Sequence, residues 1–490
     1  MAHRDRWASR PAFIMAAMGS AIGLGNLWRF PMEAYANGGG AFLIPYIVAL
    51  LTAGIPLMML EYALGQRFQK SAPGSLREVD PRFEMVGWWA LGIGMAICAY
   101  YAVVMAWCFN YLAFAFTQPW KENPQAFFDS FLGLTKGPGA LGTIQWPAVV
   151  GLAITWAWIY WIIRKGVLRV GKVVMITVPL PALLTVIIAI RGFTLPGAME
   201  GLRYYLTPDF NALLNAKTWL SAYAQVFFSL SLGFGILTAY ASYLPKRSDV
   251  TNNAFLTGLA DAGYAYFAGF AVFSVLGYLA QVQGVPVESV VRGGPGLAFV
   301  VYPTAISLMP LAPLIGVLFF ITLLTLGIDS AFSIVEGAVA GVRDKWNLSQ
   351  GKVTTWFCMV GFLVGLVFTT GAGLYWLDIV DHWMNEYGLV VIGLAECILI
   401  GWFFGAAKLK EYINEVSDFR VGWWWDFFIK WLTPIALGIA LVVNIAGEMK
   451  AAYGGYPTWA LLAGGWGLVA AIIVLAAVLA RLPGRTKEGA

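Results

Sequence analysis

The sequence predicts an all-α polytopic membrane protein that crosses the bilayer twelve times. Of its 490 residues, 60% are hydrophobic and only 12% are charged, about half of the ~25% charged residues of a typical soluble domain. Its 55 glycines and 22 tryptophans fit transmembrane helices, which tolerate Gly and collect Trp at the membrane interfaces. This composition excludes a soluble globular enzyme, a collagen, a coiled coil and a disordered scaffold.

Twelve apolar runs are long enough to span a bilayer, because a hydrocarbon core of about 30 Å needs roughly 20 helical residues. The first run follows Arg4, Arg6 and Arg10 and resembles a signal peptide, but no small-residue cleavage site precedes a soluble body. We therefore expect it to be retained as the first helix. The twelve expected spans are approximately 11–36, 41–65, 86–117, 146–163, 167–191, 217–244, 254–282, 311–342, 353–371, 375–406, 431–449 and 457–480.

Basic loops alternate with longer, weakly charged loops between these runs. Of the 31 Lys and Arg residues, 23 lie on one side, in the N-terminus and in 66–85, 164–172, 245–253, 343–352, 407–430 and 481–490. Because positively charged loops stay on the cytoplasmic side, both termini are expected in the cytoplasm. The longer loops, 118–145, 192–216 and 283–310, are expected to be mainly structural caps on the other side. The net charge of +5 is thus a topology signal, and no nucleic-acid partner is expected.

Two of the runs are interrupted in the middle. Gly19, Gly23 and Gly25 lie in the first, and Gly233 and Gly235 in the sixth, although each Gly costs about 1 kcal/mol of helix propensity relative to Ala. Close helix packing is one explanation. However, run one is the first of runs 1–5 and run six is the first of runs 6–10. The two interrupted runs thus hold the same position in two successive sets of five helices, as an inverted repeat of five helices requires. Broken helices in corresponding positions favour a substrate site at the bilayer midplane.

Freed backbone groups at such breaks need partners, since an unpaired group in the bilayer costs several kcal/mol. Half-helix N-termini attract a carboxylate, and exposed carbonyl groups attract a cation. Asp261 and Asp329 lie beside hydroxyls or broken segments, and we expect them to bind sodium because an unpaired charge in the membrane is expensive. A zwitterionic substrate with sodium satisfies both kinds of group. The other acids, expected to be protonated or to bond free backbone N–H groups, are Glu61, Glu336 and Glu396.

Other functional classes lack their sequence features. No Cys/His metal spacing, Walker loop or nucleophile elbow is present, so we expect no enzyme. A channel would repeat one filter ring by symmetry, whereas the two interrupted segments differ in sequence. The cysteines lie inside apolar runs, where we expect packing and no disulfide; they are Cys98, Cys108, Cys358 and Cys397.

Four groups of motifs then carry a family resemblance. After Trp7, residues 19–31 read GSAIGLGNLWRFP, and residues 37–46 read NGGGAFLIPY. These resemble the signature of the neurotransmitter:sodium symporter family, including its prokaryotic amino-acid members. FFSLSLGFG at 227–235 with YASY at 240–243 resembles the family's sixth helix, LGIDS at 326–330 with EG at 336–337 its eighth, and GAGLY at 371–375 leading to Asp381 its tenth.

The resemblance covers about residues 4–450 and implies two inverted five-helix repeats, with broken helices 1 and 6, followed by two further helices. It implies the following division: 1–10, a cytoplasmic N-terminal gate segment; 11–191, the first repeat; 192–216, an extracellular loop; 217–406, the second, inverted repeat; 407–480, helices 11 and 12; and 481–490, a cytoplasmic tail.

The resemblance also implies two sodium sites. One would use the carbonyl groups of Gly19, Ile22 and Leu326 with the side chains of Asp329 and Ser330. The other would use Ala21, Asn26, Ser229, Asp261 and the carboxylate of the substrate. Because ion and substrate then complete each other's coordination, that shared carboxylate would couple their binding.

The sequence departs from the family at the chloride position. The family usually carries Asn where this chain has Asp261, and chloride-dependent members hold the ion among side chains that match Tyr46, Gln225, Ser229 and Ala265. Ala265 has no hydroxyl, and Asp261 lies one helical turn away on the same face. Chloride is therefore not expected, because Asp261 supplies the negative charge. The alternative that Asp261 carries an antiported proton stays open.

The substrate class follows from Gly23, because amine carriers of the family place an aspartate there. A substrate carboxylate is expected to meet the first break, sodium and the Tyr101 hydroxyl, and an ammonium group to meet carbonyls near Phe228 and Ser231. We expect a small to medium neutral, apolar amino acid; another zwitterion, such as an osmolyte or a non-proteinogenic amino acid, is the alternative. The expected contacts are Ser20, Ala21, Gly23, Leu24, Gly25, Ile97, Tyr101, Phe228, Ser229, Ser231, Phe234, Ser330, Ser333 and Ile334.

Two gates are implied for uptake by alternating access. Arg29 and Asp381 match the outer gate pair, above a lid of Tyr101 and Phe234. Exposed ion pairs are worth only ~0–1 kcal/mol, which suits a gate that must open. Short termini and short loops favour a prokaryotic inner membrane, and the oligomeric state stays open. The cytoplasmic gate is expected to comprise Arg4, Trp7, Ser242, Tyr243 and Asp344.

Overall fold

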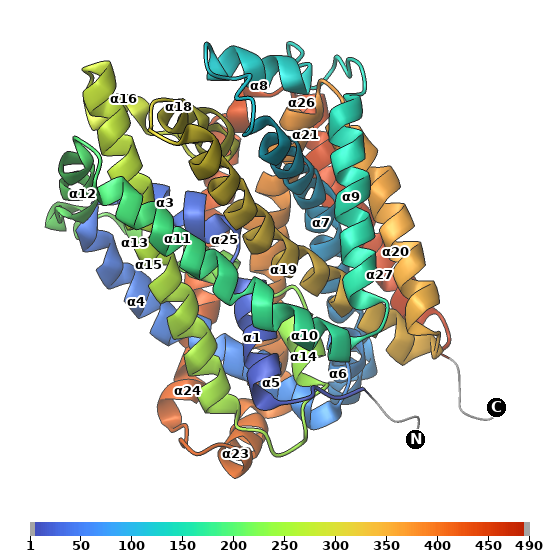
Figure 1. Cartoon of the computed structure of the whole chain (residues 1–490). Coiled ribbons are helices and arrows are strands. Elements are labelled where there is room, and N and C mark those ends of the chain that lie inside the picture. Colours follow the sequence, from blue (N-terminus) through green and yellow to red (C-terminus); the bar gives the residue numbers. More distant parts are fainter. Residues whose placement is uncertain (1–4, 485–490) are drawn as a thin grey trace.

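The computed structural model describes residues 5–484, which form an all-helical bundle with its long helices packed side by side (Figure 1). Within this range no strand occurs, and only two isolated β-bridges are present. Ten helical segments are long and apolar enough to cross a membrane, and a bent pair adds an eleventh. The predicted class, an all-α polytopic membrane protein, is confirmed.

The first five expected spans correspond to the following helices: α1 (Arg10–Ala21), α2 (Leu24–Trp28) and α3 (Phe30–Ala36); η1 (Gly40–Phe42), α4 (Leu43–Ala49), η2 (Leu50–Gly54) and α5 (Ile55–Phe68); η3 (Pro81–Phe83) and α7 (Glu84–Phe114); α9 (Trp146–Ile163); α10 (Val167–Thr177) and α11 (Pro179–Phe193).

The next seven correspond to α13 (Ala216–Ser229) and α14 (Ile236–Ala241); α15 (Val250–Gln283); α19 (Ala312–Trp346); α20 (Gln350–Gly365) and η6 (Leu366–Thr369); α21 (Gly373–Trp383), η7 (Met384–Leu389), α22 (Val390–Ile398) and η8 (Leu399–Gly405); α24 (Trp423–Phe427), η9 (Phe428–Leu432) and α25 (Thr433–Lys450); α26 (Thr458–Leu461), η11 (Leu462–Trp466) and α27 (Gly467–Arg481). The sixth span is thus two short helices, neither long enough to cross alone.

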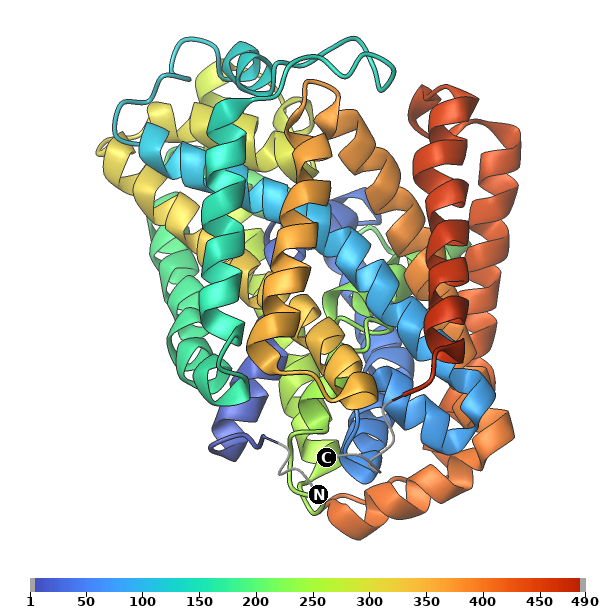
Figure 2. The ribbon, with the colours of Figure 1, turned by 90° about the vertical axis from the view of Figure 1, so that its right-hand side faces the viewer.

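Short helices occupy the connecting loops that the sequence left without structure. α6 (Ala72–Val79) and α23 (Ala406–Val416) lie at one end of the bundle, and α8 lies at the opposite end (Figures 1 and 2). We call the first the basic end, because it carries the basic loops, and the second the α8 end. The α8-end helices are α8 (Pro124–Leu132), α12 (Ala198–Leu206), η4 (Phe210–Leu214), α16 (Val287–Val290), α17 (Gly294–Gly296), η5 (Leu297–Val301), α18 (Tyr302–Ser307) and η10 (Tyr453–Gly455).

A buried ion pair at the basic end fastens the last helix to the bundle. Lys345 Nζ lies 2.7 Å from Glu84 Oε1, and both side chains are only about 5% exposed (4% and 5%). The same ammonium donates to the carbonyls of Leu479 and Ala480 at 2.5 and 3.1 Å, which are among the carbonyls that the end of α27 leaves without a helical partner. Lys345 therefore joins α19, α7 and α27.

We expect Lys345→Met to lower the free energy of unfolding by about 3 kcal/mol, because it leaves a buried carboxylate without its main partner. A fall in the melting temperature of the detergent-purified protein would measure this. Arg77→Met is the matched control: Arg77 also contacts Glu84, at 3.5 Å, but is half exposed, so its loss should cost less than about 1 kcal/mol. Equal losses for the two variants would contradict the interpretation.

Candidate functional site

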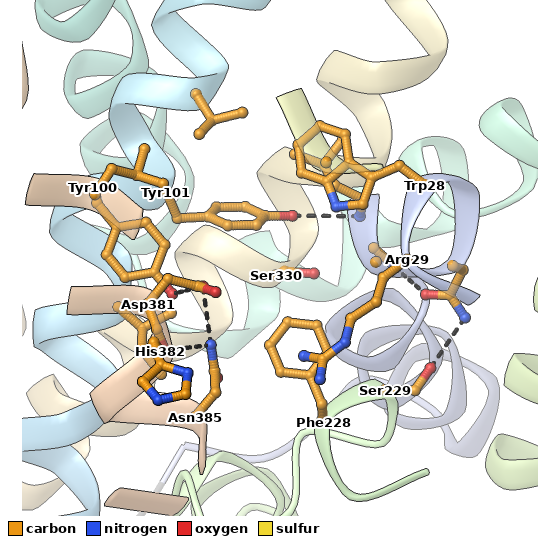
Figure 3. A pocket seen from close by; sticks show the side chains of 18 of the residues that line it. Trp28, Arg29, Tyr100, Tyr101, Phe228, Ser229, Ser330, Asp381, His382 and Asn385 are labelled. Carbon is orange, nitrogen blue, oxygen red and sulfur yellow. Dashed lines mark hydrogen bonds between the residues drawn. The ribbon is translucent and has the colours of Figure 1, made fainter. Parts of the chain in front are cut away.

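A cavity of about 430 Å³ lies between the two broken spans and the helices α7, α19 and α21 (Figure 3). It is lined by thirteen of the fourteen residues expected to contact substrate, namely Ser20, Ala21, Gly23, Leu24, Gly25, Ile97, Tyr101, Phe228, Ser229, Ser231, Phe234, Ser330 and Ile334. Ser333 is not among the lining residues. It lies on another face of α19 from Ser330 and Ile334, where its hydroxyl donates to Asp329 O at 2.6 Å and accepts from Tyr240 at 2.7 Å.

The first break directs backbone groups toward this cavity. α1 ends at Ala21, Ile22 and Gly23 are extended, and α2 begins at Leu24, so the span bends by 51°. The Leu24 N–H donates to Tyr101 Oη at 3.4 Å, as Figure 3 shows. A Cβ atom at Gly23 would lie 2.8 Å from Ser330 Oγ and 3.5 Å from Tyr101 Oη. Gly23 therefore leaves open a space bounded by N–H and hydroxyl groups.

The second break lies opposite the first. α13 ends at Ser229 and α14 begins at Ile236, and Ser231 has φ 54°, which is uncommon for a residue with a side chain. Its hydroxyl donates to Ser20 O at 2.9 Å and so joins the two breaks. The Gly233 N–H donates to Glu61 Oε1 at 2.9 Å. Glu61 thus satisfies a freed backbone group, which is one of the roles expected for it.

Residues of one expected sodium site converge on Asp261, which is fully buried. Asn26 Nδ2 donates to its Oδ1 at 2.7 Å, and Ser229 Oγ donates to its Oδ2 at 2.8 Å. Beside this cluster, both polar atoms of the Gln225 amide have no hydrogen-bond partner among the described residues. Position 265 contributes only a methyl group. The carboxylate and the Ser229 hydroxyl offer oxygen atoms of the kind that bind a hard cation, whereas Asn26 presents its Nδ2 to Asp261 and its Oδ1 accepts from the Gly23 N–H at 2.9 Å.

Residues of the other expected sodium site meet at Asp329, which is 2% exposed. Ser330 Oγ lies 3.5 Å from Gly19 O and 3.2 Å from Ser20 O. Asp329 Oδ2 faces Gly19, since a Cβ built there would lie 3.0 Å from it. Oδ1 accepts from Thr177 Oγ1 at 2.7 Å. The sequence reasoning missed Thr177, because a single Thr inside an apolar run gives no signal of what it contacts.

The predicted outer-gate residues both line the cavity, but they are not bonded to each other. Arg29 lies over the Phe228 ring, 4.8 Å from its centroid, and its Nη2 is 3.3 Å from Glu386 Oε1. Asp381 instead accepts from Tyr100 Oη at 2.5 Å and from Asn385 Nδ2 at 2.8 Å, as Figure 3 shows. The sequence reasoning did not identify Glu386.

At the basic end, residues of the expected cytoplasmic gate pack around Trp7. Its Nε1 donates to Tyr240 O at 2.9 Å, and its backbone N–H donates to Tyr243 O at 3.3 Å. The Tyr243 hydroxyl donates to Glu336 Oε1 at 3.1 Å. The remaining expected members are Ser242, whose hydroxyl donates to the carbonyl of Ala239, Asp344, which accepts from the N–H and hydroxyl of Ser71, and Arg4, which lies outside the described residues.

Comparison with known proteins matches residues 4–129 and 121–484 to the model of the sodium:neurotransmitter symporter family. An uncharacterized sodium-dependent transporter of Methanocaldococcus jannaschii is 44% identical over 458 residues, covering 93% of each chain. The human sodium- and chloride-dependent creatine transporter 1 is 34% identical, covering 93% of this chain and 80% of its own length. The rat sodium- and chloride-dependent taurine transporter is 32% identical, covering 96% and 83%.

Proposed function

Because the chain belongs to the sodium:neurotransmitter symporter family, we propose that this sodium-dependent symporter imports a neutral, apolar amino acid by alternating access. The observation that carries the proposal is the cavity between the two broken spans, which backbone groups and hydroxyls line. Two buried carboxylates lie next to this lining: Asp261 is bonded to the lining residues Asn26 and Ser229, and Asp329 precedes the lining residue Ser330. This region unites a place for a carboxylate, a place for an ammonium group and oxygen ligands for a cation.

The polar groups of the cavity support a zwitterion. Its carboxylate would occupy the space at Gly23 beside the Leu24 N–H and the Tyr101 hydroxyl. Its ammonium group would meet the Phe228 carbonyl, which lies at the end of α13 and accepts from the Ser231 N–H at 3.2 Å. Position 23 is Gly, so the cavity lacks the aspartate that amine carriers of the family place there.

The apolar part of the cavity limits the size of the substrate side chain. Ile97, Phe234 and Ile334 line it, and Gly94 lets Ile334 and Phe234 pack closely against α7, since a Cβ there would lie 3.2 Å from Ile334 and 3.5 Å from Phe234. These walls favour a small to medium apolar side chain. A carrier of another small zwitterion is the second candidate, because the creatine and taurine carriers are 34% and 32% identical to this chain.

We further propose two sodium ions, one at Asp261 and one at Asp329. The ion at Asp261 would share the substrate carboxylate, so each would strengthen the binding of the other. Chloride would not be needed, because the Asp261 carboxylate already places a negative charge beside Ser229. These roles agree with the burial of both acids and with the hydroxyl groups of Ser229 and Thr177 that bond them.

The chain is a multi-pass membrane protein, and we propose that its basic end faces the cytoplasm of a prokaryotic cell. The α8 end would then face outward, and the cavity would be closed at the cytoplasmic side by the contacts of Trp7. We also propose the division into a first repeat, 11–191, and an inverted repeat, 217–406. The proposed transport cycle involves no enzymatic chemistry.

Binding of radiolabelled substrates to the purified protein tests the function. A panel of neutral amino acids, with taurine and creatine, is measured in sodium chloride, sodium gluconate and choline chloride. We expect binding of an apolar amino acid that needs sodium and survives gluconate. Binding of taurine or creatine alone would select the second candidate, and loss of binding in gluconate would contradict chloride independence.

We expect Gly23→Ala to weaken substrate binding at least tenfold without unfolding the protein. The backbone at Gly23 is extended and accepts Ala, but the new methyl group would lie 2.8 Å from Ser330 Oγ, in the space left for the carboxylate. Gly263→Ala is the matched control, because a Cβ there meets nothing within 4 Å. Equal substrate affinity in the two variants would rule out a carboxylate at Gly23.

A further inference from the structure

The single strongly basic side chain of the cavity is surrounded by more than one acid. Among the described residues that line the cavity, Arg29 is the only Lys or Arg, whereas Glu33, Asp381 and Glu386 all lie close to it. Arg29 Nη2 is 3.3 Å from Glu386, and Arg29 Nε is 4.0 Å from Glu33. Its guanidinium therefore has a choice of carboxylate partners.

Asp381 is bonded to other groups in this structure. Its Oδ1 accepts from both Tyr100 Oη and Asn385 Nδ2. These two donors stabilise the carboxylate without Arg29, so Asp381 does not need Arg29 as a partner in this structure. The cavity, in the same structure, extends past Arg29 to the exposed Gly293 and to Tyr453 at the α8 end.

Glu386 is held in place by a helix outside the ten expected repeat helices. Asn444 Nδ2, on α25, donates to Glu386 Oε2 at 2.9 Å. One turn away, His382 Nε2 lies 2.7 Å from Glu448 Oε1. Residues four apart lie on the same face of a helix. The pairs His382–Glu448 and Glu386–Asn444 are therefore neighbouring contacts between two antiparallel helical segments. Asn444 thus leaves Oε1 of Glu386 directed at Arg29.

We infer that Glu386 is a second acid of the outer gate, positioned by Asn444, which holds Arg29 away from Asp381 while the cavity is open. Closure then exchanges one carboxylate for another, so Arg29 keeps a partner throughout and is never left as an unpaired charge. Since an unpaired charge near the membrane is expensive, this exchange lowers the barrier to closure. The inference rests on the proposed outer gate but not on the identity of the substrate.

The test measures access to the cavity without any substrate. Val104→Cys places a thiol on the cavity wall, and its rate of modification by a membrane-impermeant methanethiosulfonate reagent reports how open the cavity is. The native cysteines are buried, and the protein without Val104→Cys gives their background. We expect Glu386→Gln in this background to slow modification about five-fold, since loss of a partly exposed ion pair shifts an equilibrium by a factor of this order.

Three further variants separate the gate from general effects. Asn444→Ala should slow modification in the same direction but less, and Asp381→Asn combined with Glu386→Gln should restore the rate, because neither acid then holds Arg29. Glu448→Gln, which removes the neighbouring contact to α25, should leave the rate unchanged. An unchanged or faster rate in Glu386→Gln, or an equal slowing in Glu448→Gln, would overturn the inference. Failure of the substrate panel alone would overturn the proposed function and leave this result standing.

Discussion

Asp329→Ala is expected to abolish sodium-coupled uptake and to weaken sodium binding at least 100-fold. The carboxylate is buried at the first break, with Oδ2 facing Gly19 and Oδ1 bonded to Thr177. Alanine removes the carboxylate of this cluster, and a desolvated cation without a counter-charge is strongly disfavoured. Uptake into proteoliposomes under a sodium gradient and sodium-dependent binding of the labelled substrate would measure the two losses.

Two variants control for folding and for simple loss of contacts. Thr177→Val removes only the donor to Asp329 and should weaken sodium binding by less than tenfold. Asp329→Thr keeps an oxygen ligand without the charge and should give an intermediate affinity. The melting temperature of each variant shows whether the protein is folded. Coupled uptake retained by a folded Asp329→Ala protein would remove this residue from the ion site.

The second large effect is expected from Asp261→Asn, which should weaken sodium-dependent binding about tenfold or make it sensitive to chloride. The substitution keeps the shape of the side chain but removes the negative charge that Asn26 and Ser229 bond. Binding measured in sodium chloride and in sodium gluconate distinguishes the two results. A variant that binds like the parent in both salts would refute the role of Asp261.

A double variant tests the physical reason for chloride independence. Asp261→Asn combined with Ala265→Ser removes the charge and adds a hydroxyl one turn away on α15. The Gln225 amide, which matches the same chloride site, has no hydrogen-bond partner among the described residues. We expect this protein to bind substrate in chloride and to lose most of that binding in gluconate. Ala265→Ser alone should remain independent of chloride, because the Asp261 carboxylate still repels an anion.

Most of the fold was predictable, because the lipid requires long apolar helices and the basic loops mark where these helices end. The glycines at 19–25 and 233–235 correctly located both breaks, since these positions combine low helix propensity with backbone that must find new partners. The expected lengths were less accurate: α15 starts at Val250 and not near 254. The short helices of the connecting loops carry no apolar run long enough to span a bilayer, and so they were missed.

The candidate site was predictable where a residue belongs to a contiguous motif and not where it depends on packing between distant helices. The motif residues Gly23, Phe228 and Ser330 line the cavity. Ser333, which lies between two motif segments, does not, although its neighbour Ile334 does, because a step of one residue turns a side chain by about 100° around the helix. Glu386 and Thr177 acquire their contacts from the rotation of α25 and α10 about their axes, which a single sequence does not specify.

The packing of Trp7 has a consequence for the speed of transport. Its indole N–H donates to the Tyr240 carbonyl within α14, and its backbone N–H donates to the Tyr243 carbonyl just beyond α14. Its ring contacts the rings of Phe13, Tyr240 and Tyr243. The two hydrogen bonds and the ring contacts with Tyr240 and Tyr243 must break before Trp7 and α1 can separate from α14. Opening toward the basic end therefore carries an enthalpy cost, so turnover should rise steeply with temperature whenever that step limits the cycle.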